Sequence, residues 1–281
     1  MKQVRFLSQT FALLLLTQTT LAGEGKLLAT AGLTQLEGSG GGGIVPWATV
    51  AGYDSEDEFS VAAFSTQVNL DDYRLNAWGV SVGIYDRIEI SAARQTFDLT
   101  SLGGDINQNI FGVKTRLYGD VIYSAWPQTS IGLQYKKLQD PGVAKLVGAK
   151  SYDDGTDLYL AMTKVHLGAL AGYNLIWNIT ARATKANQLG LLGYGGINNN
   201  HYEVMLEGSL GVLVSRQLAI GVEYRQKPDN LAIKEDDWKD LFVTYLPNKH
   251  VNFTAAWAQL GDIAGAKDQQ GLYLSMTGYL W

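Results

Sequence analysis

Apolar residues alternate with small or polar residues over stretches of 10 to 14 residues, and this alternation limits the folds that the sequence can adopt. Residues 75–85 read LNAWGVSVGIY, with an apolar side chain at every second position from Trp78 to Ile84. Residues 218–227 and 251–260 repeat the pattern. Because successive side chains of a strand point to opposite faces, each segment has one apolar face and one small or polar face. The chain is predicted to be all-β.

Fourteen segments of this kind run along the chain, most of them longer than the usual strand of about 5–6 residues. Their length suits a tilted strand that crosses a bilayer, which needs about 9–11 residues. The segments are 26–36, 46–53, 58–69, 74–85, 88–99, 108–118, 129–138, 156–167, 174–185, 201–214, 217–227, 237–247, 250–260 and 270–281.

The connectors between these segments alternate in length. Two-residue connectors at 86–87, 215–216 and 248–249 all follow even-numbered segments. The long connectors 139–155, 186–200, 228–236 and 261–269 all follow odd-numbered segments, while 70–73 and 119–128 break the rule. Short turns at one end and long loops at the other are typical of an outer-membrane barrel.

The predicted fold is therefore a transmembrane up-and-down antiparallel β-barrel of about 14 strands, whose closure pairs every backbone group within the bilayer. If residues 26–53 fold inside as a plug, 12 strands remain. Residues 1–22 are predicted to be a cleaved signal peptide, because the basic residues Lys2 and Arg5 precede a short apolar run and Ala22 suits a cleavage site. The barrel domain is then 23–281, placed in the cell outer membrane in contact with its lipid.

Composition narrows the chemistry further. The chain has no Cys and 3 His, which argues against thiolate or imidazole metal sites, and no cofactor is expected. Its net charge is −5, and −7 once Lys2 and Arg5 are removed, so nucleic acid is a poor partner.

The polar parity of the segments is predicted to line the barrel interior. The charged residues on it are Lys114, Arg116, Lys136, Arg182, Glu203, Glu207, Glu223 and Arg225. In an open pore these mixed charges would give weak selectivity, whereas in a narrow barrel they could pair across the lumen and close it. The predicted function is a porin-like passive channel for small solutes of unknown identity.

Three alternatives stay open. Uptake of hydrophobic compounds, of fatty acid or aromatic hydrocarbon type, would use the glycine-rich segment 38–43 or the apolar residues 189–192 to guard an apolar upper third of the lumen. A lipid-modifying enzyme would need His201, with Ser151, Asp153 and Asp154 on a neighbouring loop as candidate partners. No spacing motif joins these residues, so no catalytic residue is predicted and the protein is not expected to be an enzyme. A purely structural barrel is the third alternative.

Other motifs have ordinary explanations. Gly38, Gly40 and Gly43 fit a phosphate-loop spacing, but no helix follows, so a glycine loop is expected that either projects outward or constricts the lumen. The acidic runs 54–58 and 235–237 lack the ordered spacing of a calcium loop and are predicted to be solvated, so no metal site is predicted.

Aromatic residues are expected to form two belts at the membrane surfaces. The outer belt would include Trp78, Tyr202, Trp238 and Trp257, and the inner belt Tyr85, Trp177, Tyr245 and Trp281. The chain ends on Tyr279 and Trp281, a pattern that resembles the terminal signal by which the barrel-insertion machinery recognises bacterial outer-membrane proteins.

Several blocks of sequence resemble an uncharacterised, domain-of-unknown-function family of predicted Gram-negative outer-membrane β-barrel proteins. They are GGGGIVPWATVAGY (40–53), GIYDRIEIS (83–91), GTDLYLAMTK (155–164), RATKANQLGLLGYGG (182–196), EYRQKPDN (223–230), EDDWKDLF (235–242) and LPNKHV (246–251). The resemblance implies a barrel and export, but it brings no substrate and no catalytic residue.

Overall fold

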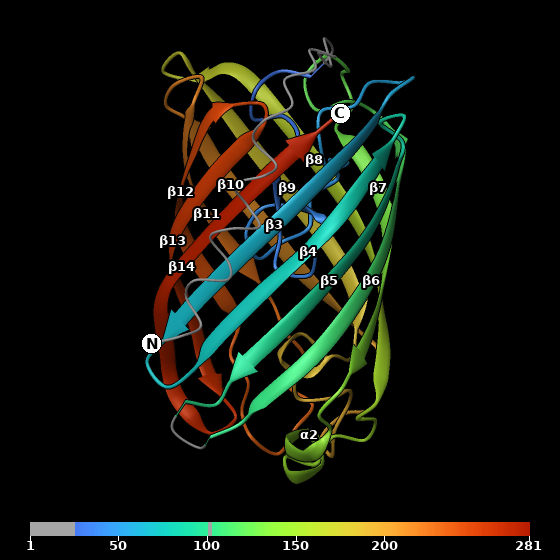
Figure 1. The fold of residues 1–281 in the computed structure, drawn as a ribbon, viewed down its shortest axis with the longest axis vertical. Helices are drawn as coiled ribbons and strands as arrows, with labels where there is room; N and C mark the ends of the chain where they lie inside the picture. Colours follow the sequence, from blue (N-terminus) through green and yellow to red (C-terminus); the bar gives the residue numbers. More distant parts are fainter. Residues whose placement is uncertain (1–25, 101–102) are drawn as a thin grey trace.

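The chain folds as a closed antiparallel β-barrel, seen here in a computed structural model that describes residues 26–100 and 103–281 (Figure 1). The predicted signal peptide, residues 1–22, lies outside the described residues. The wall consists of β3 (Phe59–Leu70), β4 (Arg74–Ile84), β5 (Ile88–Asp98), β6 (Asp105–Tyr118), β7 (Gln128–Leu138), β8 (Asp154–Leu170), β9 (Tyr173–Thr184), β10 (Glu203–Leu213), β11 (Leu218–Arg225), β12 (Trp238–Asn248), β13 (Val251–Ile263) and β14 (Ala266–Leu280).

The barrel closes where the last strand meets the first. β14 pairs with β3 from Gly271 opposite Leu70 to Leu280 opposite Val61. Among the described residues the wall has 12 strands, so the prediction of about 14 is wrong and the 12-strand alternative with an internal N-terminal plug is confirmed. Of the segments 26–36 and 46–53, the first contributes only the two-residue strand β1 (Leu33–Thr34) and the second contributes no strand. β1 pairs inside the barrel with β2 (Gly40–Gly41), which lies between the two segments.

The physical reason for the error lies in the N-terminal segments themselves. Every residue from 31 to 54 is buried, on both parities, so this stretch has no face for lipid. Gly32, Gly38 and Gly52 adopt positive φ angles of 72°, 92° and 97°, which interrupt any extended strand. The segment therefore folds as a compact loop and not as two wall strands.

The wall itself follows the alternation of the sequence. In β12, for example, Leu241 and Val243 are exposed on the outer surface while Phe242 and Thr244 face inward and are buried. Trp78 and Trp257 are exposed on the outside, as the belt prediction requires. Trp238 is only 2% exposed and lies inside the barrel, so its assignment to the outer belt is wrong.

The two ends of the barrel differ. Short connectors such as 171–172 and 249–250 gather at the end where the C-terminus lies, and we call this the short-turn end. The opposite, long-loop end carries the connectors 139–153, 185–202 and 226–237 and the helix α2 (Gly142–Leu146) (Figure 1). The predicted long connector 261–269 is wrong, because β13 and β14 continue until Ile263 pairs with Ala266.

Candidate functional site

The lumen of the barrel is filled by residues 26–58, which we call the plug. Figure 1 shows most of this segment inside the wall, where residues 31–54 are all buried. The segment passes directly into β3 at Phe59. The glycine-rich segment 38–43 belongs to the plug, so it folds into the lumen and not outward. Three carboxylates anchor the plug: one is its own and two come from the wall.

The first anchor is Glu37 of the plug. Its carboxylate forms ion pairs with Lys136, with Arg225 Nη1 at 2.7 Å and with Arg182 Nη2 at 3.5 Å. Two wall carboxylates bind the same cations: Asp157 contacts Lys136 and Arg182, and Glu207 contacts Arg182 and Arg225. We call these six residues the Glu37 cluster. Their side chains are at most 3% exposed, and their three positive and three negative charges balance, as burial of charge requires.

The second anchor is Glu223 on β11. Its Oε2 accepts hydrogen bonds from the backbone N–H groups of Gly43, at 2.6 Å, and Ile44, at 2.8 Å. Ser209 donates to its Oε1 at 2.6 Å, and the indole of Trp47 in turn donates to Ser209. A Cβ at Gly42 would lie 1.8 Å from Glu223 Oε1, so the close approach of carboxylate and plug backbone requires glycine there.

The third anchor is Glu89 on β5. It accepts hydrogen bonds from Ser39 Oγ at 2.8 Å and from the backbone N–H groups of Gly40 and Ala51 at 3.1 and 2.8 Å. Lys114 forms an ion pair with Glu89 at 3.0 Å and donates to the carbonyl of Gly40 at 2.8 Å. Charge-assisted hydrogen bonds of this kind are roughly twice as strong as neutral ones, so the plug is held by several strong contacts.

Six of the eight charged residues singled out from the sequence take part in these anchors. They are Lys114, Lys136, Arg182, Glu207, Glu223 and Arg225. Arg116 lies instead at the short-turn end, where it pairs with Asp86 and Asp120. Glu203 is half-buried at the long-loop end of β10, and the described residues give it no ion pair. Sequence reasoning missed Glu37, Glu89 and Asp157.

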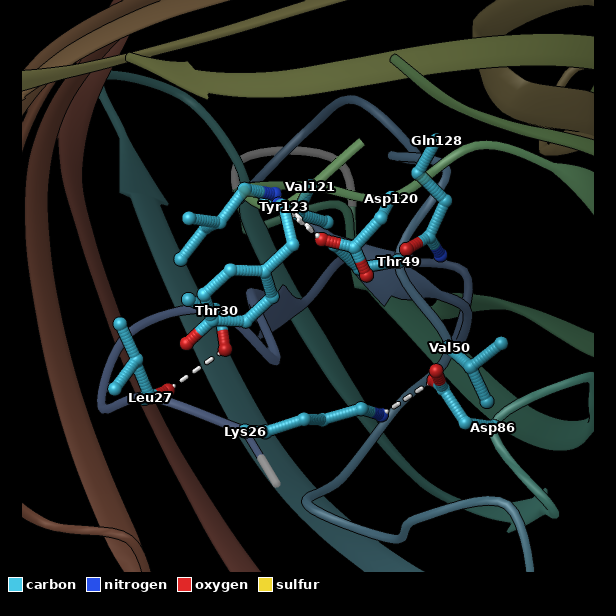
Figure 2. A pocket seen from close by; sticks show the side chains of 11 residues that line it. Lys26, Leu27, Thr30, Thr49, Val50, Asp86, Asp120, Val121, Tyr123 and Gln128 are labelled. Atoms are coloured by element: carbon cyan, nitrogen blue, oxygen red, sulfur yellow. Dashed lines mark hydrogen bonds and ion pairs between the residues drawn. The ribbon is translucent and has the colours of Figure 1, made fainter. Parts of the chain in front are cut away.

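A small cavity lies between the plug and the connectors of the short-turn end. It measures about 40 Å³ and is lined by residues of the plug and of the 120–123 connector, as Figure 2 shows. Lys26 extends across it to pair with Asp86 at 2.8 Å and with Asp54 at 3.4 Å. Asp54 also accepts hydrogen bonds from Ser60 Oγ and the Asp86 N–H, both at 2.8 Å. The space admits water and no larger solute.

At the long-loop end the lumen is covered by residues 185–196, which we call the lid. Tyr194 anchors it by donating to Gln108 Oε1 and to the carbonyl of Lys136, each at 3.2 Å. The buried lid residues Leu191 and Leu192 border an apolar cavity of about 10 Å³. The wall side of that cavity is formed by Leu75, Phe97, Trp238, Leu260 and Ile263. The contact between lid and wall is therefore mostly apolar, with Gln188 as the polar residue that lines the cavity and Lys227 hydrogen-bonded to it at 2.8 Å.

Two ionisable residues lie beside the lid in the 226–237 loop. Burial raises the pKa of Glu235 to about 7, although the charge of Lys227 opposes the rise. Burial lowers the pKa of Lys227 to about 8, although the charges of Glu235 and Asp237 oppose the fall. Glu235 thus contributes stability that is complete below pH 4.5 and is lost as the pH rises through 7, whereas the contribution of Lys227 is lost as the pH falls through 8.

The other candidate chemical sites remain dispersed. His201 is exposed, and within the described residues no side-chain hydrogen bond joins it to Ser151, Asp153 or Asp154. The acidic run 54–58 is not simply solvated as predicted, because Asp54 is fully buried as a plug contact. In residues 26–100 and 103–281 no group of three His, Asp or Glu side chains is placed to hold a metal ion. No helix in the same ranges is long and apolar enough to cross a membrane.

Comparisons with known proteins agree with the barrel. The family described as "Protein of unknown function (DUF3034)" matches residues 30–277, and no curated protein matches the sequence. Among solved structures the chain is similar to the NanC porin, at 9% identity and a TM-score of 0.50, over 79% of this chain and 100% of that one.

Two further structures are similar at lower TM-scores. The outer membrane protein Omp33 of Acinetobacter baumannii matches at 8% identity and a TM-score of 0.47, over 80% of this chain and 100% of that one. The COG4313 outer membrane channel from Pseudomonas putida F1 matches at 12% identity and a TM-score of 0.41, over 84% and 97%. The likeness to the NanC porin shows a shared barrel fold.

Proposed function

This chain belongs to the family described as "Protein of unknown function (DUF3034)", and from its lumen we propose that it is an outer-membrane channel for small solutes that the plug holds closed. The observation that carries the proposal is the chemistry of the inner wall. Lys114, Lys136, Arg182 and Arg225 project from paired wall strands into the lumen. A barrel with only a structural role needs no such charges, and burying them is costly.

Movement of the plug is the step that would open the path. When the plug leaves, water replaces it around the wall charges, so the lost hydrogen bonds are exchanged for hydration and not left empty. Six of the charged residues predicted from the sequence then line the path: Lys114, Lys136, Arg182, Glu207, Glu223 and Arg225. Arg116 and Glu203 stand near its two ends.

A reversible lock between plug and wall tests the proposal. The backbone N–H of Ala48 lies 2.8 Å from Thr163 Oγ1 on β8, and the chain has no cysteine of its own. In the double variant Ala48→Cys with Thr163→Cys, we expect solute-dependent current across planar bilayers only after reduction of the disulfide. Each single-cysteine variant serves as the control, because it cannot form the lock.

Deletion of residues 26–53 gives the complementary measurement. If the plug closes the channel, the deletion should conduct continuously and lose its response to reduction. The proposal is rejected if the reduced double variant and the deletion both insert as folded barrels and neither passes ions nor sugars in liposome swelling. That outcome would favour a structural barrel.

A second candidate function is uptake of hydrophobic compounds, and the apolar side chains where lid and wall meet favour it. The cavity of about 10 Å³ between them is too small for such a compound, so the lid would have to move before one could enter. Leu191 and Leu192 of the lid face Trp238 and Phe97 of the wall with no charged side chain lining the space. We expect a fluorescent fatty acid to quench Trp238, and the variant Trp238→Phe to remove the signal. Trp257→Phe on the outer surface is the matched control. Equal quenching in both variants would indicate micelle partitioning and count against this function.

Export and insertion complete the proposal. The outward apolar face is consistent with the outer membrane as the site of action. Recognition by the barrel-insertion machinery through the C-terminal strand stays a proposal. Tyr279 points inward and donates to the carbonyl of Gly32 in the plug at 3.1 Å, which leaves Trp281 as the better candidate for that signal. Loss of Trp281 should therefore slow assembly in a reconstituted insertion assay, and Tyr279→Phe should not.

A further inference from the structure

Glu37 is the only charged residue between positions 27 and 53 of the plug. It is fully buried, and both of its oxygens are paired with cations of the wall. Its neighbours Leu36 and Gly38 carry no charge, so the plug delivers one isolated carboxylate to one place on the wall. The carboxylate of Glu37 thus occupies the wall cations as a bound ligand would.

The wall holds this site in position without help from Glu37. Lys136 pairs with Asp157 at 2.6 Å, Arg225 pairs with Glu207 at 3.5 Å, and Arg182 pairs with both carboxylates. Gln134 accepts a further hydrogen bond from Arg182 at 2.7 Å. The three cations are therefore preorganised on β7, β9 and β11, and the carboxylates that hold them lie on the intervening strands β8 and β10. Without Glu37, three cations face two carboxylates, and the site has one uncompensated positive charge.

The lid covers this site at the long-loop end, and its contact with the wall is mostly apolar. Tyr194 of the lid donates to the backbone carbonyl of Lys136, so the lid rests directly on the strand that carries one of the three cations. Leu191, Leu192 and Gln188 line the space on the lid side, and Trp238 lines it on the wall side. Lys227 lies 5.2 Å from the centre of the Trp238 ring and donates to Gln188 Oε1 at 2.8 Å. A solute entering from this end would meet these apolar side chains together with Lys227, and the three cations of the wall next. That order suits a carboxylate attached to an apolar body.

We propose that Lys136, Arg182 and Arg225 form a carboxylate-binding site, and that the solute is an organic monocarboxylate which competes with Glu37 for it. This inference rests on the proposed channel and names its substrate class. Guanidinium groups match carboxylate geometry well. Binding of a solute carboxylate replaces the Glu37 contacts one for one, so it lowers the cost of releasing the plug.

Chemical rescue of Glu37→Ala in detergent-purified full-length protein tests the site without any current measurement. Removal of one member of a buried ion cluster should raise the hydrogen-exchange rate of the plug amides at 36–47 by about 100-fold or more. Added acetate should restore most of that protection. Acetamide, and chloride at the same ionic strength, should not. Glu56→Ala, which removes an exposed carboxylate of the plug, is the matched control and should need no rescue.

Competition in the unmodified protein provides the second measurement, should Glu37→Ala fail to fold. Benzoate should speed exchange of the plug amides in a saturable manner, and benzamide should have no effect. Equal effects of acetate and chloride in Glu37→Ala overturn the carboxylate site, as do equal effects of benzoate and benzamide. A protein that shows rescue but never conducts would refute the channel and keep the site, so the two failures are distinguishable.

Discussion

Replacement of Gly42 by alanine should loosen the plug while leaving the barrel wall intact. The new Cβ would lie 1.8 Å from Oε1 and 2.6 Å from Cδ of Glu223, distances that no real contact tolerates. Either the carboxylate turns away or the plug backbone retreats. In both cases the hydrogen bonds from the Gly43 and Ile44 N–H groups, at 2.6 and 2.8 Å, are lost.

The size of the effect follows from those two bonds. A hydrogen bond to a charged group contributes about 1.5–3 kcal/mol, so the loss of two weakens plug docking by at least about 3 kcal/mol. Since about 1.4 kcal/mol corresponds to a factor of ten, exchange of the plug amides at 36–47 should speed up by roughly 100-fold. Mass spectrometry after deuterium labelling in micelles measures this rate peptide by peptide, with the wall strands as an internal reference.

The matched control is Gly142→Ala in helix α2, where nothing lies within 4 Å of an added Cβ. It should leave the exchange of the plug unchanged. Equal protection of residues 36–47 in Gly42→Ala and Gly142→Ala would refute the reasoning, because it would mean that Glu223 does not hold the plug.

Three further predictions concern the lid, the neighbouring loop and the outer surface. Glu235→Gln should reduce the change in the free energy of unfolding between pH 4 and pH 9 by about 3 kcal/mol, because the pKa of Glu235 is raised from 4.5 to about 7. Urea titrations across that pH range measure the change. A pH profile equal to that of the unmodified protein would contradict the argument that burial raises this pKa. Leu192→Ala, at a 1% exposed position of the lid, should cost about 2–5 kcal/mol of lid stability by hydrogen exchange, and Ile197→Ala, at a 69% exposed position, should cost almost nothing. Leu241→Arg on the outer face should destabilise the barrel in lipid by about 2–4 kcal/mol, whereas Leu146→Arg in the long-loop end should be neutral; similar losses in detergent and in lipid would argue against membrane contact at Leu241.

The wall of the barrel could be predicted from the sequence because lipid imposes a rule on every second residue. Leu241 and Val243 must be apolar, while Phe242 and Thr244 need only fit the interior. The same rule placed Glu207 and Glu223 inside. The same rule also places Glu89 and Asp157 inside, because they lie at inward-facing positions of β5 and β8.

The plug could not be predicted in the same way. Residues 31–54 are buried on all sides, so the alternation found in 26–36 and 46–53 does not mark a lipid-facing surface there. Glu37 looks like an ordinary polar residue until the strands that supply Lys136 and Arg225 are brought around it. The alternation tells which face of a strand a residue lies on, but not where it lies along the barrel axis. Arg116 and Glu203 therefore share the inward face with Arg182 but lie near the two ends of the barrel, away from the Glu37 cluster.

The plug continues without a break into β3, so the plug of each barrel is covalently attached to its own wall. If the proposed channel opens by release of the plug, its reclosure is a first-order event whose rate is independent of how many copies the membrane holds. A detached peptide of the same sequence would have to reach a concentration on the order of millimolar to compete with a tethered one. Under the proposed function, cells that make both full-length barrels and barrels without the plug should therefore contain two separate populations of pores, one closed and one open, and the plug of one barrel should not close another.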